Sequence, residues 1–193
     1  MTHYPENNVL RQIWQFLYEG VNRANYMEEN KANIDFDGKE AMYGEVYFLR
    51  AYYYFQLVKF FGDVPLFTER RLSAGDSGTL VRVPKEEVYA QIEIDLQNAI
   101  DNLPTSQSQV GRVNIYTAYS LLGKVLLYQD KFSEAASALD NVIGVYSLVS
   151  DYGSQFLRFG ENGPESVFEI QYSNQSNWYD WGCAHCSEGN YAI

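Results

Sequence analysis

The sequence contains few of the residues on which common catalytic sites depend. Histidine occurs only at His3 and His185, and cysteine only at Cys183 and Cys186. There is no G-x-S-x-G motif and no glycine-rich phosphate loop, so the usual hydrolase and nucleotide-binding signatures are missing. A glycosidase needs two carboxylates facing each other across a cleft, whereas most acidic residues here fall on expected polar helix faces or in turns. We therefore expect a protein that is not an enzyme.

Positive charge is also scarce, with 14 lysine and arginine residues against 25 aspartate and glutamate residues. The net charge of −11 argues against nucleic acid and anionic membrane surfaces as partners, because both would repel the chain. No run of about eighteen apolar residues occurs, which predicts that no helix spans a membrane. The first residues, Met1–Glu6, have neither a basic region nor an apolar core, so we do not expect them to be a signal peptide.

Aromatic residues are abundant, at 16% of the chain with 17 tyrosines, and many lie in a segment predicted as one long helix from roughly Lys39 to Phe61. Gly62 is expected to end this helix, and Val64-Pro65 to continue it as extended chain. A helix that is apolar over most of its circumference is a central one, packed on several sides. Two stripes at spacings of three and four predict the buried faces: Val46, Leu49, Tyr53, Leu57 and Phe60, then Tyr43, Tyr47, Tyr54, Val58 and Phe61.

Arg50 is the one charged residue predicted to point into the apolar side of this helix. An unpaired buried charge is very costly, so Arg50 needs a carboxylate or several carbonyl groups. We favour a structural ion pair over an anion-binding role. Asp95 flanks the buried stripe of a later helix and is placed to meet an inward arginine, although the sequence does not say which one.

The same helix carries a family resemblance, in the motif Glu45-x-x-Phe48-Leu49-Arg50-Ala51-x-x-Tyr54-Phe55-x-Leu57-Val58-x-x-Phe61-Gly62-Asp63-Val64-Pro65-Leu66. It resembles the signature segment of the SusD/RagB family, surface lipoproteins of Bacteroidetes that bind nutrients, usually glycans, and cap a TonB-dependent outer-membrane transporter. The resemblance implies an oligosaccharide or other nutrient as ligand, a SusC-like transporter as partner and a place on the outer membrane. Family members begin with an export signal and a lipid-modified cysteine and are longer, so we expect an internal or truncated portion of a longer protein, or an unusually short relative.

Two further long helices are predicted on either side of the central one. Asn7 or Asn8 can cap a helix that runs to about Lys31. Pro84 suits the first turn of a later helix that Pro104 ends. The buried stripe of this later helix is predicted from helical spacing: Val88, Ile92, Leu96, Ala99 and Leu103.

A helix pair follows, with the spacing of a tetratricopeptide (TPR) repeat. The repeat positions are Tyr119, Leu122, Gly123, Leu126, Ala135 and Leu139. The small residues Gly123 and Ala135 allow close approach, so residues from about 113 to 130 and 132 to 146 should form an antiparallel pair. One repeat cannot bury its own face, and the earlier helices must be its neighbours. The predicted fold class is therefore all-α, a TPR-like array of about five helices over residues 7–146.

The pattern changes beyond Ser150, and we expect a strand-and-loop appendage over about 151–193 within one SusD-like domain spanning 1–193. Residues 165–172 alternate as in a short strand. The tail that follows has no packing period and is expected to be loop or disorder.

The tail holds the best ligand candidates, the aromatic residues Trp178, Tyr179 and Trp181 beside the amides Asn174 and Asn177. Sugar rings stack their C–H faces on aromatic planes, while amides hydrogen-bond to hydroxyl groups. The alternative is that these rings only cover the helical core.

Cys183 and Cys186 have C-x-x-C spacing, which is half of a structural zinc site, and no second cluster completes it. We expect a fortuitous pair or a local disulfide, and neither a metal nor a cofactor. The sequence thus favours non-catalytic binding of a glycan or other nutrient at the bacterial outer-membrane surface, and its delivery to the transporter. A TPR scaffold that docks proteins and binds no sugar is the alternative.

Overall fold

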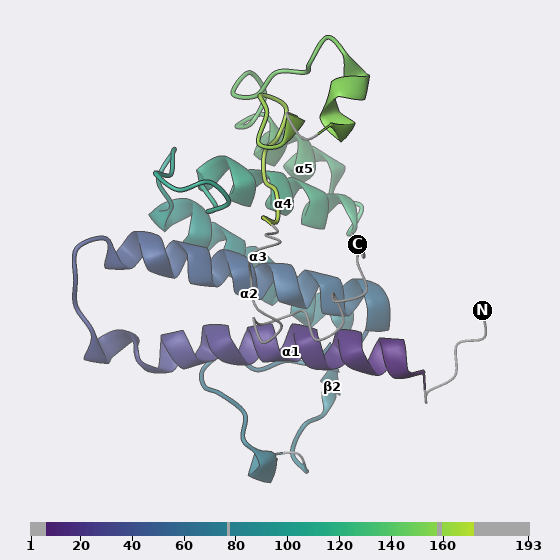
Figure 1. The fold of residues 1–193 in the computed structure, drawn as a ribbon. Coiled ribbons are helices and arrows are strands. Elements are labelled where there is room, and N and C mark those ends of the chain that lie inside the picture. The colour runs from purple at the N-terminus through teal and green to yellow at the C-terminus, as the bar shows by residue number, and fades with distance from the viewer. Residues whose placement is uncertain (1–6, 77, 158–159, 172–193) are drawn as a thin grey trace.

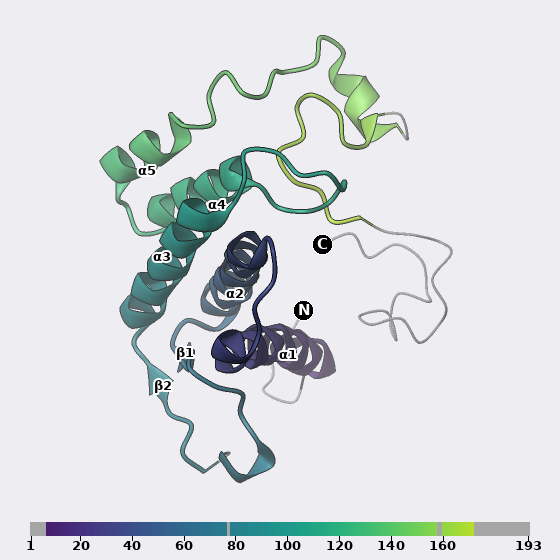
Figure 2. The ribbon, with the colours of Figure 1, turned by 90° about the vertical axis from the view of Figure 1, so that its left-hand side faces the viewer.

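The computed structural model describes residues 7–76, 78–157 and 160–171. This part of the chain is an array of five α-helices, which confirms the predicted all-α, TPR-like class (Figure 1). Two very short strands and three short 3-10 helices complete it. The helices are α1 (Asn8–Glu29), α2 (Lys39–Phe61), α3 (Lys85–Asn102), α4 (Ile115–Leu127) and α5 (Phe132–Leu139). Seen from the side, they follow one another in an arc from α1 to α5 (Figure 2).

Helix α1 starts where the sequence predicts, because the side chain of Asn7 accepts hydrogen bonds from the first free backbone amides, those of Val9 and Leu10. Its buried face includes Leu17, Val21 and Ala24 and packs against α2. The 3-10 helix η1 (Lys31–Asn33) and a turn then reverse the chain into α2.

Helix α2 has the predicted bounds and ends at Gly62, whose positive φ of 68° suits glycine and whose N–H donates to the carbonyl of Val58. The stripe through Tyr43, Tyr47 and Tyr54 is buried. The other predicted stripe is only partly buried, and the residues Leu49 and Phe60 on it are 40% and 49% exposed. That prediction was wrong at these two positions, because α2 packs mainly on α1 and α3, and its remaining side has few neighbours in the described chain.

The chain between α2 and α3 leaves and returns as an antiparallel pair of two-residue strands, β1 (Val64–Pro65) and β2 (Arg82–Val83). Between them lies a surface excursion that contains the 3-10 helix η2 (Ala74–Asp76). Asp63 then links the end of α2 to the start of α3, since its carboxylate accepts the backbone N–H of Lys85 at 2.9 Å.

Helix α3 buries the predicted stripe completely, from Val88 to Leu103. The α4–α5 hairpin is confirmed as well. A Cβ on Gly123 would lie 2.6 Å from Cγ of Leu139, so glycine allows this close approach, and any larger residue would force Leu139 to move. Helix α5 is shorter than predicted and ends at Leu139 instead of near residue 146, because turns follow immediately and Gly144 adopts a positive φ of 85°.

The segment after α5 contains the 3-10 helix η3 (Tyr152–Phe156) and then runs back to the helical array (Figure 2). The predicted strand at 165–172 is wrong over its described residues, 165–171, which have no strand structure. These residues make isolated contacts instead of a backbone ladder: Thr117 Oγ1 donates to the carbonyl of Val167, and the ring of Phe168 meets that of Phe48 at 5.7 Å.

None of the helices in the described ranges has the length and apolarity needed to cross a membrane.

Candidate functional site

The predicted sugar platform lies outside the described residues. Trp178, Tyr179, Trp181, Asn174 and Asn177 all fall in 172–193, so their role stays a prediction. The pair Cys183 and Cys186 lies in the same range. Over the described ranges, no group of three or more His, Cys, Asp or Glu side chains is arranged to hold a metal ion.

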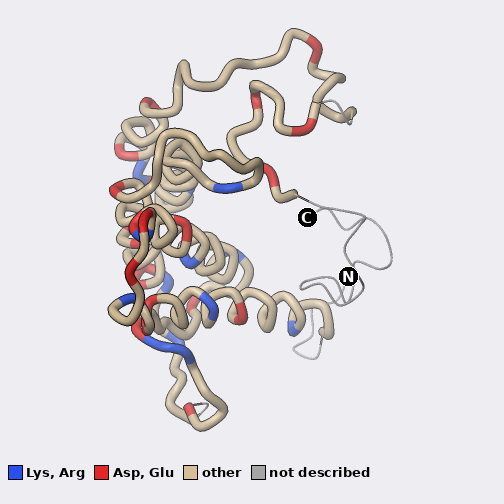
Figure 3. The backbone as a smooth tube through the Cα atoms, turned by 60° about the vertical axis from the view of Figure 1, so that its left-hand side comes forward, with Lys and Arg blue, Asp and Glu red and all other residues tan. Residues whose placement is uncertain are grey.

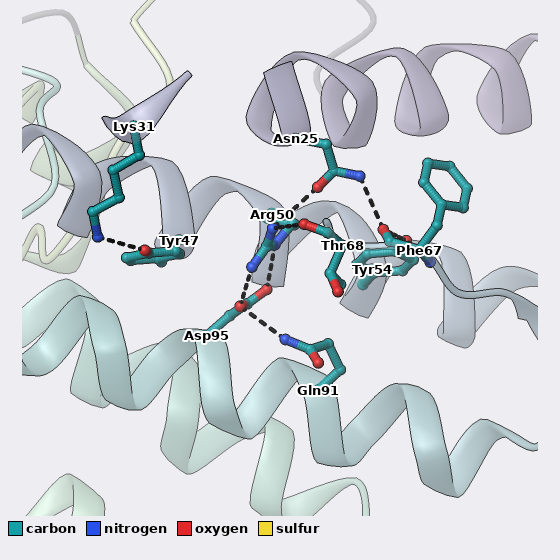
Figure 4. Close-up of polar contacts among 9 residues, drawn as sticks. All are labelled: Asn25, Lys31, Tyr47, Arg50, Tyr54, Phe67, Thr68, Gln91 and Asp95. Atoms are coloured by element: carbon teal, nitrogen blue, oxygen red, sulfur yellow. Dashed lines mark hydrogen bonds and ion pairs between the residues drawn. The ribbon is translucent and has the colours of Figure 1, made fainter. Parts of the chain in front are cut away.

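The most extensive polar cluster of the described chain surrounds Arg50 in the core (Figure 4). Its Nε and Nη2 donate to the two carboxylate oxygens of Asp95, at 2.8 and 2.7 Å. Its Nη1 donates to Asn25 Oδ1 at 3.0 Å and to the carbonyl of Thr68 at 2.8 Å. Arg50 and Asp95 are 4% and 0% exposed. The predicted buried ion pair is confirmed, and Asp95 is the partner.

The two pKa values in this pair reflect burial and mutual attraction. Burial by itself lowers the pKa of Arg50, but the hydrogen bonds and the charge of Asp95 outweigh it, and the pKa is raised. Burial raises the pKa of the Asp95 carboxyl, and Arg50 opposes that effect. The forked geometry fits a charged guanidinium on a carboxylate.

The cluster extends to the backbone of the chain that follows β1. Asn25 Nδ2 donates to the carbonyl of Phe67 at 2.9 Å, and the hydroxyl of Tyr54 donates to the same carbonyl at 2.7 Å while it accepts the N–H of Phe67 at 3.0 Å. Tyr18 donates to the carbonyl of Pro65 at 2.7 Å. The cluster therefore connects α1, α2, α3 and the excursion, and each guanidinium nitrogen of Arg50 has a partner within it.

A groove of about 410 Å³ opens on the surface between α3 and α5. Its floor is the face of α4 that carries Tyr119, Leu122 and Leu126, three of the positions that match the TPR pattern. Polar side chains of α3 and α5 form its two sides, among them Gln97 and Glu134. Sequence reasoning missed this groove, because the pattern indicates which residues face a neighbour but not how far apart two helices stand.

The described part of the chain is thus a helical array of TPR-like type, with a polar cluster inside its apolar core and a groove on its surface. Residues 2–127 match a SusD-like family described as "Starch-binding associating with outer membrane". The chain therefore belongs to the SusD-like family.

Similar proteins agree with this assignment. SusD-like protein P2 of Formosa agariphila is 31% identical over 140 residues, which are 72% of this chain and 28% of that protein. The solved structure of a laminarin-binding SusD-like protein is 35% identical, with a TM-score of 0.81 over 89% of this chain and 40% of that one. Surface glycan-binding protein A from Bacteroides uniformis is 27% identical, with a TM-score of 0.76 over 86% of this chain and 39% of that one.

This chain spans about a third of the length of the curated relatives that it matches. The matches do not favour the alternative of a TPR scaffold that binds no sugar.

Proposed function

We propose that this chain is the helical part of a non-catalytic protein that binds a polysaccharide at the bacterial surface. One observation carries the proposal: nearly nine-tenths of the chain superimposes on a laminarin-binding member of its own family at 35% identity. The surface glycan-binding relative supports the same ligand class. We therefore take laminarin as the first ligand to test and soluble starch, which the family description suggests, as the second.

Attachment to the outer membrane and delivery of the glycan to a TonB-dependent transporter belong to the same proposal. The family description, with its association with the outer membrane, supports the location. The transporter follows from the family resemblance of the α2 motif alone. In this scheme the array α1–α5 is the rigid body, and the platform of Trp178, Tyr179 and Trp181 with Asn174 and Asn177 holds the sugar.

Tryptophan fluorescence tests the platform cleanly, because the chain has three tryptophans and Trp14 lies in the array against Tyr18 and Phe61. We expect laminarin to change the emission of wild type and of Trp14→Phe alike. Trp178→Ala and Trp181→Ala should each weaken binding by about 1 kcal/mol, several-fold in Kd, because each removes one stacking contact. Affinity should vary little with salt, since a neutral sugar releases no counterions.

One result would contradict the choice of ligand, and another would contradict the platform. If neither laminarin nor starch binds to the 193-residue chain in a calorimetric titration, the chain by itself has no site for either of these two glycans. If a sugar binds but Trp178→Ala and Trp181→Ala bind it as tightly as wild type does, the platform is wrong and the binding site is elsewhere in the chain.

A further inference from the structure

The groove between α3 and α5 has a mixed lining, with an apolar floor and polar sides. Tyr119, Leu122 and Leu126 follow one another on α4 at spacings of three and four, so they lie in one row along the floor. All three are buried or partly buried. The volume of about 410 Å³ falls within the usual range for sites that bind small molecules. The groove is therefore large enough for a small ligand that has an apolar face.

The two sides of the groove keep hydrogen-bond donors that the protein does not use. On α5, the side chain of Ser133 makes no hydrogen bond to the described chain, so its hydroxyl group can donate as well as accept. On α3, Gln97 Nε2 uses one N–H on Asp101 Oδ1 at 2.8 Å and keeps the other. A ligand that accepts hydrogen bonds therefore meets donors on both sides.

Unused acceptors lie beside these donors. Asn141 Nδ2 donates to the carbonyls of Ser137 and Ala138 at 3.0 and 3.2 Å, which leaves Oδ1 as an acceptor. The hydroxyl of Ser137 donates to the carbonyl of Ser133 at 3.0 Å and keeps its lone pairs. The carboxylate of Glu134 has no hydrogen bond or ion pair within the described ranges. Groups that donate and accept at once, as hydroxyl groups do, match this lining best.

The charges around the groove argue against an ionic ligand. Neither lysine nor arginine is among the described residues that line it. Glu93 already accepts from Lys131 at 2.6 Å and from Gln129 at 2.7 Å, so in the described lining a cation meets a single unpaired carboxylate, that of Glu134. Helices α3 and α5 carry more acidic than basic residues, as the charges along the backbone show (Figure 3). An anion would be repelled, and a neutral polar ligand is favoured.

We propose that the groove between α3 and α5 is a second saccharide site, which binds a stretch of neutral glucan. The C–H face of a sugar ring packs on the apolar row around Leu122. Its hydroxyl groups donate to the Glu134 carboxylate and to Asn141 Oδ1, and they accept from Ser133 and Gln97. The choice of a glucan rests on the proposed function, because laminarin and starch are both glucans. The site itself shares no residue with the platform of that function.

The test is a titration of the isotope-labelled 193-residue chain with laminaritriose and with maltotriose, followed by amide NMR spectra. The backbone amides of Ser133 and Ala138 report on the groove. The indole N–H groups of Trp178 and Trp181 report on the platform. One spectrum thus measures both sites, and the failure of one does not hide the other.

Two pairs of variants locate the binding. Ser137→Trp fills the groove with a large ring, and its matched control, Ala136→Trp, puts the same ring on an exposed position outside the lining. Glu134→Ala removes the unpaired carboxylate. Its control is Glu86→Ala, which removes an exposed carboxylate in the first turn of α3, as Glu134 lies in the first turn of α5. Circular dichroism verifies that each variant is folded, and Glu134→Ala keeps the test valid if Ser137→Trp is not.

We expect at least one of the two trisaccharides to shift the groove amides of wild type. Ser137→Trp should abolish these shifts, and Ala136→Trp should keep them. Glu134→Ala should weaken the Kd measured from the shifts by about tenfold, because a charged acceptor of hydroxyl groups is lost, whereas Glu86→Ala should change it by less than about twofold. Trigalacturonate, a negatively charged trisaccharide, should leave the groove amides unshifted.

Three results would overturn the proposal. They are no shift of the groove amides with either neutral trisaccharide, equal loss with the groove variants and their controls, and equal shifts with trigalacturonate. The indole signals separate this proposal from the proposed function. Indole shifts without groove shifts would keep the platform and reject the groove, whereas groove shifts without indole shifts would keep the groove and reject the platform.

Discussion

Helices α1–α3 and the α4–α5 hairpin are stabilised in different ways. Between α1, α2 and α3, large side chains such as Tyr43, Tyr54 and Phe55 are almost fully buried, and the Arg50–Asp95 pair lies among them. The hairpin has a small cluster of buried hydrophobic residues that is separate from the main core. In the described chain this cluster consists of Leu126, Ala135 and Ala138. Helix α5 has eight residues and begins with Phe132, which is 63% exposed.

This difference indicates a division of roles. The first three helices hold most of the buried apolar surface, and burial of that kind is the main source of stability. The hairpin buries less, and the small residues at its seam set how closely α5 approaches α4. We expect α1–α3 to behave as the stable unit and α5 to open more easily, which amide exchange and mutation can test.

The largest effect is expected from Arg50→Ala. It leaves the carboxylate of Asp95 buried without its cation, and Asn25 and the carbonyl of Thr68 without a donor. Removal of one partner from a buried pair costs about 3–5 kcal/mol, so the free energy of unfolding in urea should fall by that amount. Arg23→Ala, at an exposed pair with Glu19, should cost less than about 1 kcal/mol.

A double variant sharpens this prediction. Arg50→Met with Asp95→Leu removes both charges and refills most of the volume, so it should be more stable than Arg50→Ala. The recovery should be incomplete, because the Thr68 carbonyl still lacks its donor. If Arg50→Ala unfolds at the same urea concentration as wild type, the Arg50–Asp95 pair does not stabilise helices α1–α3.

Much of this core could be predicted from the sequence. The apolar spacing in α2 and α3 and the stop at Gly62 gave the helix bounds, and the position of Arg50 among apolar residues required a buried partner. The identity of the other acceptors could not be predicted, since Asn25 lies on a different helix and the Thr68 carbonyl belongs to a loop. Local periodicity carries no information on which distant backbone group will face a side chain.

The errors have a common physical origin. Leu49 and Phe60 continue an apolar stripe, but whether a stripe is covered depends on neighbours that the helix itself does not encode. Residues 165–171 alternate like a strand, but a strand also needs a partner edge. The groove over Tyr119 and Leu122 depends on the spacing of α3 and α5, which the repeat pattern does not determine.

The next largest effect is expected at the hairpin seam. A methyl group added in Gly123→Ala would overlap Leu139, and overpacking of this kind typically costs about 1–3 kcal/mol. The loss should be local: amide exchange should speed up in α5 and remain slow in α2. Adding Leu139→Ala to Gly123→Ala makes room for the methyl group, so the two changes should cost less together than the sum of each alone. Additive costs would show that the two residues do not crowd each other.

High pH should destabilise helices α1–α3 through their buried tyrosines. Burial, the largest cause, raises the pKa of Tyr54, Tyr18 and Tyr53 above the ordinary value. A pKa raised by folding gives a stability contribution that is fully present below about pH 10 and is lost as the pH rises through the folded pKa. Each such tyrosine adds up to about 1.4 kcal/mol of lost stability for each pH unit above 10.

Urea titrations between neutral pH and pH 11 or so measure this slope. Tyr54→Phe is the informative variant. It should be less stable than wild type at neutral pH, because the hydroxyl bonds both backbone groups of Phe67, and it should lose stability less steeply in alkali. An unchanged alkaline slope in Tyr54→Phe would mean that Tyr54 ionises in the folded protein as readily as in the unfolded chain.

The smallest effect is expected from Lys131→Met, at the ion pair that ties the start of α5 to α3. Lys131 Nζ lies 2.6 Å from Glu93 Oε1, but the two side chains are 40% and 28% exposed, so solvent screens their attraction. Glu93 also keeps a second donor, Gln129 Nε2 at 2.7 Å, when the lysine is removed. The cost should therefore be about 0.2–1 kcal/mol and should shrink further in concentrated salt.

Amide exchange measures whether the loss of this ion pair acts on α5 alone. If α5 opens separately, Lys131→Met should accelerate amide exchange in α5 by a few-fold at low salt. Exchange in α2 should stay as slow as in wild type, because the opening that breaks the pair does not require α1–α3 to open. Equal acceleration in α2 and α5 would require the two regions to unfold together. In that case the small cluster of Leu126, Ala135 and Ala138 would be an extension of the main core, and the distinction between the two units would fail.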